Sequence, residues 1–366
     1  MDIRINSGSG GDVNMMHRVK MIVTNGFDPD VRVYKEAKYL VAKGFDVEIL
    51  CWDREAKYED REVELIDGIK IKRLFPRANY GTGYKQVVPY VKFIIACKNY
   101  LYGKDYEYLH CHDLDGVIVG YFCRRKKCKL IFDMHEYYGG QERKRKSKYI
   151  INFFINYMHN ISNYIIYLNE IQRKAISNNN IEKLIFVPNY PEKGYYSNIN
   201  RLKTDKLRIS YIGGVRQYNE LKNLFDACIG IDDVNISIHG AGTAYSRLKE
   251  IEKNYNNVNI TGEYHFSQSA EIYSDADILY VVYDIKNDNW RNAYPIKFFE
   301  AIITKTPVIV SKGSVLEEFL RENDIGFVVD GSNIGEIRDL IIGIINNRSL
   351  LDEKVKSLEK IQFKYT

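Results

Sequence analysis

The sequence predicts an α/β protein with two Rossmann-like domains, each built on a parallel sheet. Short apolar segments alternate with longer amphipathic segments along the chain, an order typical of parallel strands covered by helices on both faces. A polar, turn-rich stretch interrupts this alternation once, near the middle of the chain. At 366 residues, the chain is long enough for two domains of ordinary size.

The individual segments follow from their apolar pattern and from the turn residues between them. In the first half we expect strands at 18–24, 47–51, 69–74, 108–112, 129–132, 164–168 and 184–187, and helices at 31–43, 86–102 and 115–125. In the second half we expect strands at 207–212, 235–239, 257–260, 278–282, 307–310 and 326–329. We therefore predict a flexible tail at 1–16, domains at 17–188 and 207–366, and an interdomain linker at 189–206. A ligand is expected in a central cleft at the carboxyl ends of the strands.

Composition narrows the class of protein. The 53 basic and 48 acidic residues give a net charge of +5, which is too weak to indicate a nucleic-acid partner. The six cysteines show no paired spacing, so they are expected to be reduced thiols of a cytoplasmic protein. No apolar stretch approaches the ~20 residues that span a bilayer. The polar, Gly/Ser-rich start does not look like a signal peptide.

The most informative segment is 292–311. A polar turn with Pro295 opens an apolar helix that carries one carboxylate, Glu300, and a buried strand follows. Free backbone N–H groups at such a helix start can hold an anion. A carboxylate one helical turn later can accept hydrogen bonds from a sugar diol, so the segment suits phosphates beside a ribose. The alternative is an ordinary loop–helix–strand unit.

Glycines and cations follow the first strand of the second half. Gly213 and Gly214 end that strand, and Arg216 and Lys222 come directly after them. Glycines allow the backbone to approach a ligand, and the two cations could stabilise a leaving diphosphate without a metal. Gly240 and Gly262, each in a turn after a later strand, are weaker candidates of the same kind. Taken singly, each of these motifs could also be a simple turn.

Polar side chains also follow strands of the first half, where α/β proteins place their ligands. Gly26 lies in the loop that leads to Asp30 and Arg32, and two further strands end at His112–Asp113 and before His135–Glu136. A metal site is the alternative for His112, Asp113, His135 and Glu136. Their spacing matches no established zinc signature, so we predict no metal.

In their order and spacing, these motifs resemble glycosyltransferase family 4, the retaining enzymes with the GT-B fold. The resemblance extends over nearly the whole chain from Val19 and rests on 30–40 with Gly44, His112–Asp113, 133–136, Gly213–Gly214, Arg216, Lys222, 240–242, 276–279 and 295–300 before 306–309. It implies retention of anomeric configuration, in general without a required metal ion.

The resemblance also implies roles for residues. Arg216 and Lys222 would bind the donor diphosphate, Glu300 the ribose hydroxyls, and backbone N–H groups near Ile296 and Lys297 the phosphate. His135 would lie beside the donor sugar and the reacting carbon, and the loop at Gly26 would cover the diphosphate and the acceptor side. The remaining donor-side candidates are Gly214, Gly240, Gly262 and Asn292, and those on the acceptor side are Asp30, Arg32, His112, Asp113 and Glu136.

Two departures from the family pattern stand out. The first glutamate of its Glu-x7-Glu pair is replaced by Asn292, whose amide can still hydrogen-bond sugar hydroxyls. The chain stops after 361–366, where the family usually continues into a helix that crosses back onto the first domain, so we expect that crossover helix to be missing.

The expected function is transfer of a sugar from a UDP- or GDP-linked donor to a glycan acceptor, soluble or lipid-linked, in surface polysaccharide synthesis. The nucleotide sugar is a co-substrate, and no cofactor is expected. The alternatives are a nucleotide-sugar 2-epimerase on the same fold, and a protein that binds a nucleotide sugar without turnover.

A basic run at 143–148 precedes an apolar-aromatic helix at 149–158, and 124–127 forms a second basic cluster. Such a combination can dock on the anionic inner face of the cell membrane, which would make the protein peripheral there. The alternative is a solvated charge run before a core helix.

Overall fold

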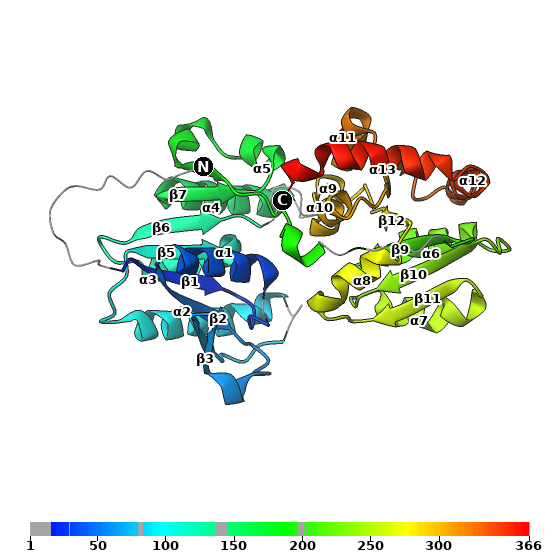
Figure 1. Cartoon of the computed structure of the whole chain (residues 1–366). Coiled ribbons are helices and arrows are strands. Elements are labelled where there is room, and N and C mark those ends of the chain that lie inside the picture. Colours follow the sequence, from blue (N-terminus) through cyan, green and yellow to red (C-terminus); the bar gives the residue numbers. More distant parts are fainter. Residues whose placement is uncertain are drawn as a thin grey trace. The chain divides into compact units, whose positions relative to one another are not determined.

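The computed structural model describes residues 16–28, 30–79, 83–135, 145–196, 199, 201 and 204–365, without the side chains of 145–150, 193 and 266. The described residues form two compact units, one ending at Pro188 and the other beginning at Asn189. Each unit is a twisted sheet covered by helices on both faces, which confirms the predicted α/β class (Figure 1). We describe each unit by itself, and the predicted cleft stays a prediction.

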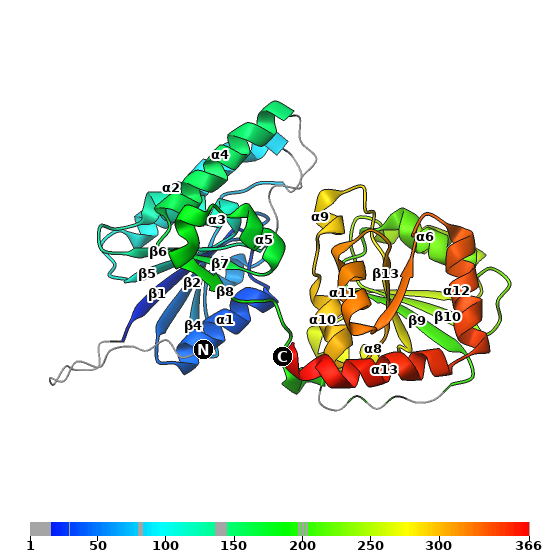
Figure 2. The same cartoon turned by 90° about the horizontal axis from the view of Figure 1, so that it is seen from above.

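The sheet of the first unit has the strand order β3-β4-β2-β1-β5-β6-β7-β8. Its strands are β1 (Arg18–Val23), β2 (Asp46–Trp52), β3 (Val63–Ile66), β4 (Ile69–Leu74), β5 (Tyr108–His112), β6 (Lys129–Asp133), β7 (Tyr164–Tyr167) and β8 (Leu184–Phe186). Its α-helices are α1 (Val31–Ala42), α2 (Val87–Leu101), α3 (Asp113–Cys123), α4 (Arg145–Ile161) and α5 (Glu170–Ala175). Helices α2, α3 and α4 cover one face of the sheet, and α1 covers the other (Figure 2).

Helix α1 shows how local sequence places the polar residues of this unit. The Asp30 side chain caps the helix by accepting a hydrogen bond from the Val33 N–H at 3.3 Å, and the helix ends before Gly44, whose φ of +83° suits glycine. Arg32 and Glu36 lie one turn apart on the face turned toward the sheet. Both therefore become buried or nearly buried charges that need partners inside the unit.

Strand β3 was missed by the sequence analysis, which predicted only parallel strands. It pairs antiparallel with β4 at the edge of the sheet. A tight turn at Asp67 and Gly68, with φ of +49° and +81°, joins the two strands. An Asp-Gly pair between two apolar segments is a hairpin signal, so this strand could have been predicted.

The second unit has a parallel sheet with the order β11-β10-β9-β12-β13-β14. Its strands are β9 (Leu207–Ile212), β10 (Val234–His239), β11 (Val258–Gly262), β12 (Ile278–Val281), β13 (Val308–Ser311) and β14 (Gly326–Val329). Its α-helices are α6 (Tyr218–Ala227), α7 (Tyr245–Ile251), α8 (Ser269–Ser274), α9 (Asp288–Arg291), α10 (Ile296–Ile303), α11 (Val315–Asn323), α12 (Ile334–Asn346) and α13 (Ser349–Ile361). Every predicted strand is present, within two residues at each end.

Part of the segment predicted as a linker packs on the second unit. The ring of Tyr190 lies 4.8 Å from that of Phe299, and Arg201 donates from Nη1 to the Lys305 carbonyl at 2.7 Å. Tyr196, which is almost fully buried, reaches the middle of α10. These contacts give the segment a structural role in the second unit beyond that of a tether.

None of the helices within the described ranges is long and apolar enough to cross a membrane.

Two glycines of the second unit provide a matched test of packing. An added Cβ at Gly326 in β14 would lie 2.1 Å from the Val308 carbonyl oxygen, whereas at Gly343 in α12 it would meet nothing within 4 Å. We expect Gly326→Ala to lower the free energy of unfolding by about 1–3 kcal/mol through overpacking. Gly343→Ala should raise it by about 1 kcal/mol through helix propensity. Urea denaturation of both variants checks the two signs, and equal effects would contradict this account.

Candidate functional site

In the second unit, the loops that follow β9, β10 and β11 are joined by backbone hydrogen bonds. Gly213 donates to the His239 carbonyl at 2.8 Å, and Gly240 donates to the Gly262 carbonyl at 2.7 Å. A Cβ at Gly240, where φ is +130°, would lie 2.0 Å from the Gly213 carbonyl oxygen. The close approach of these loops thus requires glycine at position 240. The structure therefore places the predicted Gly240 and Gly262 at one edge of the sheet, in loops that are joined by backbone hydrogen bonds.

Helix α10 begins at the same edge, after β12. Pro295 precedes its first turn, and no side chain caps the helix there. Within that turn, Phe298 donates to the Pro295 carbonyl at 2.9 Å. An uncapped helix start directs backbone N–H groups and the positive end of the helix dipole outward, which favours an anion. The predicted contacts at Ile296 and Lys297 lie at this helix start.

Lys297 places a buried amino group at this helix start. Its side chain is 6% exposed, and its Nζ has no hydrogen-bond partner among the described residues. The ammonium lies 3.6 Å from the centroid of the Tyr211 ring, a cation–π contact. Burial lowers the pKa of Lys297 to about 7, although Glu300 opposes the shift and Arg216 reinforces it. A buried cation without a counter-ion, beside an uncapped helix start, fits an anionic ligand.

Glu300 lies one turn further along α10 and is almost fully buried. Its two carboxylate oxygens accept hydrogen bonds from the hydroxyls of Tyr196 at 2.7 Å and Tyr273 at 2.8 Å. Burial raises the pKa of Glu300, and the two tyrosine hydrogen bonds oppose that shift. The sequence analysis missed both tyrosines, because Tyr196 comes from the segment predicted as a linker and Tyr273 from α8.

The two predicted diphosphate cations differ in their surroundings. Lys222 forms an ion pair of 2.5 Å with Asp226, one turn further along α6, and Tyr255 donates to the same carboxylate. Arg216 is exposed and forms no ion pair in the part of the chain that the structure describes. Arg216 is therefore the freer of the two, and Lys222 must leave Asp226 to meet a ligand.

Asn292 and Gly214 make local contacts. Asn292 ends α9 and donates from Nδ2 to the Asp288 carbonyl at 2.8 Å. Gly214 is exposed, and its carbonyl accepts a hydrogen bond from the Tyr211 hydroxyl at 2.7 Å. The Tyr211 ring that carries the cation–π contact with Lys297 is thus oriented by the glycine loop itself.

In the first unit, an ion network lies at the carboxyl ends of β5 and β6. Arg32 contacts Asp133 Oδ1 at 2.8 Å and Glu36 Oε1 at 2.9 Å from the same nitrogen, Nη2. Its Nη1 donates to the Val187 carbonyl at 3.3 Å. Burial opposes ionisation of Asp133, yet Arg32 holds the pKa of Asp133 well below its usual range. The charge of Arg32 is thus compensated within the first unit, and its predicted role on the acceptor side stays a prediction.

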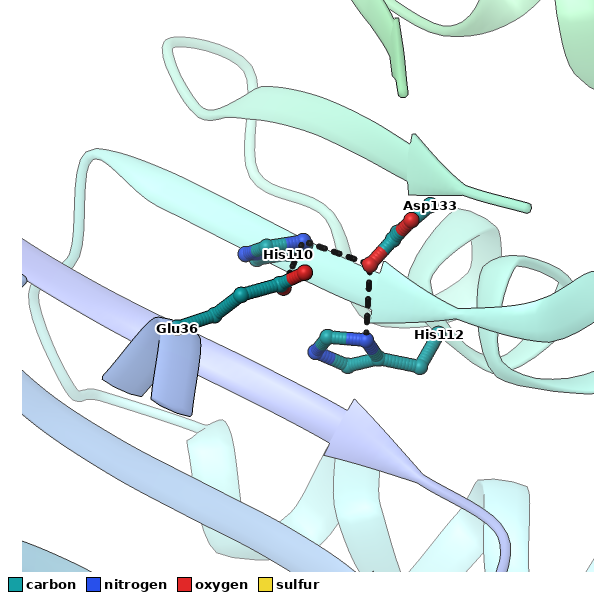
Figure 3. Close-up of side chains that lie close together, drawn as sticks. All are labelled: Glu36, His110, His112 and Asp133. Atoms are coloured by element: carbon teal, nitrogen blue, oxygen red, sulfur yellow. Dashed lines mark ion pairs between the residues drawn. The ribbon is translucent and has the colours of Figure 1, made fainter. Parts of the chain in front are cut away.

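The other carboxylate oxygens, Asp133 Oδ2 and Glu36 Oε2, face two histidines of β5. His110 and His112 alternate along the strand and therefore share one face, and Figure 3 shows both turned toward Asp133 and Glu36. His112 Nδ1 lies 3.2 Å from Asp133 Oδ2, and His110 Nε2 lies 3.6 Å from both carboxylates. Burial and the neighbouring His110 hold the pKa of His112 well below its usual range.

Four of these side chains could together hold a metal ion. Ligand atoms of Glu36, His110, His112 and Asp133 lie within 4.8 Å of one another. This set differs from the four residues that the sequence analysis considered for a metal. Arg32 already supplies a positive charge to both carboxylates, which is what a cation would contribute. The contacts are therefore accounted for by an arginine-centred ion network, and the absence of a metal stays a prediction.

His135 lies at the outer end of this network. Its Nε2 is 3.0 Å from His112 Nδ1 and 3.4 Å from Asp133 Oδ2, and its Nδ1 is 3.5 Å from Asp113 Oδ2. Burial opposes its charge, but Asp133 and then Asp113 raise the pKa of His135 to about 9. Asp113 and Asp133 orient the ring from the buried side. The side chain is 20% exposed, so the ring still reaches the surface. Glu136, predicted beside it, lies outside the described residues.

The loops after β1 and β2 enclose an open cavity of about 290 Å³. Gly26, Asp30, Asp53, Arg54 and Lys57 are among its lining residues. Asp30 accepts a hydrogen bond from Asn25 Nδ2 at 2.9 Å, in addition to capping α1. Carboxylates and cations around an open cavity suit a ligand rich in hydroxyl groups.

Two family models match the chain in succession. The model described as Glycosyltransferase Family 4 matches residues 30–190, and the model described as Glycosyl transferases group 1 matches residues 193–361. A search of curated protein sequences finds no match.

Three solved structures illustrate the proteins that share this fold at 16% identity or less. Sucrose-phosphate synthase from Thermosynechococcus elongatus is 16% identical, with a TM-score of 0.76 over 95% of this chain and 94% of that one. TarM of S. aureus, in a complex with UDP, is 15% identical, with a TM-score of 0.68 over 96% and 97% of the two chains. HepE of Anabaena, in a complex with UDP-glucose, is 11% identical, with a TM-score of 0.65 over 95% of each chain.

The ion network of the first unit should matter for stability. Asp133→Asn leaves the buried Arg32 with one carboxylate fewer, so we expect unfolding to become easier by about 3–5 kcal/mol. The control is Asp105→Asn, because the ion pair of Asp105 with Arg18 is exposed and should contribute about 0–1 kcal/mol. Denaturant unfolding measures both. An Asp133→Asn protein as stable as the control would remove the network from this role.

The buried Lys297 should make nucleoside diphosphate binding take up protons. With a pKa of about 7, Lys297 is mostly neutral at pH 8, and a bound diphosphate should restore its charge. We expect uptake of up to one proton per ligand at pH 8, fading below pH 6, where the free protein is already charged. Calorimetric titration in two buffers of different ionisation enthalpy counts the protons. Lys297→Met should abolish the uptake, and the same proton count in both proteins would contradict the assignment.

Proposed function

The chain belongs to glycosyltransferase family 4, and on that premise we propose that it transfers a sugar from a nucleotide sugar to a hydroxyl of a glycan acceptor, with retention of anomeric configuration. The bond between the anomeric carbon and the diphosphate oxygen breaks, and a bond from that carbon to the acceptor oxygen forms on the same face of the sugar. The proton of the acceptor hydroxyl passes to the departing diphosphate. Retention is expected from the family resemblance.

One observation carries the proposal, the unpaired Lys297 at the start of α10. A departing diphosphate gains negative charge as the sugar bond breaks. Lys297 Nζ, the outward N–H groups of the helix start and the exposed Arg216 are cations and dipoles already in place for that charge. The backbone hydrogen bonds that join the loops of Gly213 and Gly240 are proposed to hold these groups in position at the moment of transfer.

Glu300 is proposed to bind the ribose of the nucleotide. Tyr196 and Tyr273 each donate to one of its oxygens and hold the carboxylate in place. Each carboxylate oxygen can accept more than one hydrogen bond, so a ribose diol can still be recognised. Asn292 stands where the family often has a second carboxylate, and its carbonyl oxygen is the group proposed for a sugar hydroxyl.

The first unit is proposed to supply the acceptor side. His135 is held as a cation by Asp113 and Asp133, and in that state it donates hydrogen bonds to sugar or phosphate oxygens. The polar cavity at Gly26 and Asp30 is the proposed acceptor pocket. A growing surface glycan fits its hydroxyl-binding character.

We infer UDP as the first nucleotide to test, because structures of similar fold hold UDP or UDP-glucose. A panel of UDP- and GDP-sugars, scored for thermal shift and for release of nucleoside diphosphate with glycan acceptors, tests the proposal. Acceptor-dependent release supports a transferase. Conversion of the nucleotide sugar to its epimer without an acceptor would instead support the 2-epimerase, and a thermal shift without turnover the non-catalytic binding protein.

The roles of Arg216 and Glu300 predict separable defects. Arg216→Ala should reduce turnover by a factor that corresponds to about 2–4 kcal/mol, because a contact to the developing diphosphate charge is lost. Glu300→Gln should weaken binding of the nucleoside diphosphate and keep the fold. Arg321→Ala, on the exposed surface of α11, is the matched charge control. Steady-state rates and calorimetric titration measure these effects.

Lys222→Ala completes the series. Loss of turnover would mean that Lys222 leaves Asp226 for the ligand, whereas a wild-type rate would remove it from the mechanism. Wild-type rates for Arg216→Ala as well would remove the diphosphate site from this edge of the sheet.

A further inference from the structure

Helix α2 is apolar on two opposite faces. Its inner face buries Phe93, Cys97 and Leu101 against the sheet. Its outer face carries Val87, Val88, Val91 and Ile95, which are 46–64% exposed. These four lie at spacings that place them on one side of a helix. A surface helix of a globular protein normally has polar residues there, so this outer face requires an explanation.

The same side of the sheet carries more exposed apolar residues. Helix α3 contacts both α2 and α4, so the three helices form one layer. On α4, Phe153, Phe154 and Tyr157 are 39–67% exposed, and Phe122 at the end of α3 is 51% exposed. We use the name outer helical face for the outward-facing residues of α2, α3 and α4, together with the connection from α3 to β6. Figure 2 shows the three helices on this one side of the sheet.

Charge on the outer helical face has a single sign. No Asp or Glu occurs in 83–104, 116–132 or 145–169, although the whole chain is nearly balanced between basic and acidic residues. The exposed bases of this face are Lys92, Lys98, Arg124, Arg125, Lys126 and Lys127. The only acidic side chains of these helices are Asp113 and Asp115, in the first turn of α3. Of these bases, Arg125 pairs with Asp105, which lies between α2 and β5, at 3.8 Å. Aliphatic and aromatic side chains among an excess of bases are the chemistry of a surface that meets anionic lipid.

We propose that the outer helical face docks on an anionic lipid bilayer. Phe153, Phe154 and Ile95 would enter the headgroup region, while lysine and arginine side chains reach the lipid phosphates. The basic run at 143–148, in which the sequence analysis placed the membrane contact, has no described side chains. The docking rests instead on α2, α3 and the second half of α4. The docking itself does not depend on the proposed function. The statement that docking serves a lipid-linked acceptor does depend on it.

The test is co-sedimentation of the full chain with vesicles of phosphatidylcholine, with and without phosphatidylglycerol. We expect binding to the anionic vesicles that falls as salt rises, and little binding to the neutral ones. Ile95→Asn combined with Phe153→Asn, and separately Arg124→Gln with Lys126→Gln and Lys127→Gln, should each weaken binding at least tenfold. The matched control is Tyr39→Asn on α1, which removes a 63% exposed aromatic from the opposite side of the sheet. It should bind like the wild type.

No binding to anionic vesicles at low salt would overturn the docking, and so would equal binding by the wild type and both altered proteins. Light scattering adds a further outcome: if Ile95→Asn with Phe153→Asn dissociates a dimer, a second copy covers this face and the proposal fails. Thermal shift with nucleotide sugars on the same preparations separates the two proposals. A wild-type protein that binds nucleotide sugars but not anionic vesicles overturns the docking alone. A wild-type protein that binds the vesicles but no nucleotide sugar overturns the proposed function alone.

Discussion

A parallel sheet ends all of its strands at one edge, and this constraint organises both units of the protein. The central strands of each sheet, such as β1, β2, β12 and β13, are mostly buried. Polar side chains therefore gather in the loops that follow the strands. In the first unit that edge collects His112, Asp133 and His135, and in the second it collects Gly213, Gly240 and Lys297. Chemistry is thus concentrated at one edge of each sheet, and the rest of each unit supports that edge.

Two buried cations show how such an edge can serve either stability or ligand binding. Arg32 is surrounded by two carboxylates and a backbone carbonyl, so its charge is compensated within the first unit. Lys297 is equally buried, yet its Nζ has no hydrogen-bond partner among the described residues and lies near the rings of Tyr211 and Tyr283. A compensated charge orients its neighbours, such as His135. A buried cation that lacks a counter-ion favours the binding of an anion. Lys297 is therefore the main evidence for a diphosphate at this site.

The outer helical face follows from the same architecture. The helices of an α/β unit bury one side against the sheet and turn the other outward, so their outward residues are free to serve a second surface. In α2 and α4 that side carries exposed apolar residues, and neither helix contains a carboxylate. The carboxyl edge of the sheet and its helical face are different surfaces of the unit, so ligand binding and docking can be changed independently.

The sequence by itself determined the two α/β units and the positions of nearly all strands. It also determined the glycines and the start of α10 at the carboxyl edge of the second sheet. These features depend on local periodicity and turn chemistry. An available local signal, Asp67–Gly68, would also have placed β3. Only the tertiary structure decided which charges are compensated. Arg32 meets Asp133 across 101 positions, and Glu300 meets Tyr196 across 104. No local pattern encodes such partners, because they are brought together by strand order and by the folding of a presumed linker onto the second unit. The surroundings of two lysines were also decided by the tertiary structure. Lys222 pairs with Asp226 on its own helix, which competes with a ligand for its charge. Lys297 becomes buried only when β9 and α10 pack together.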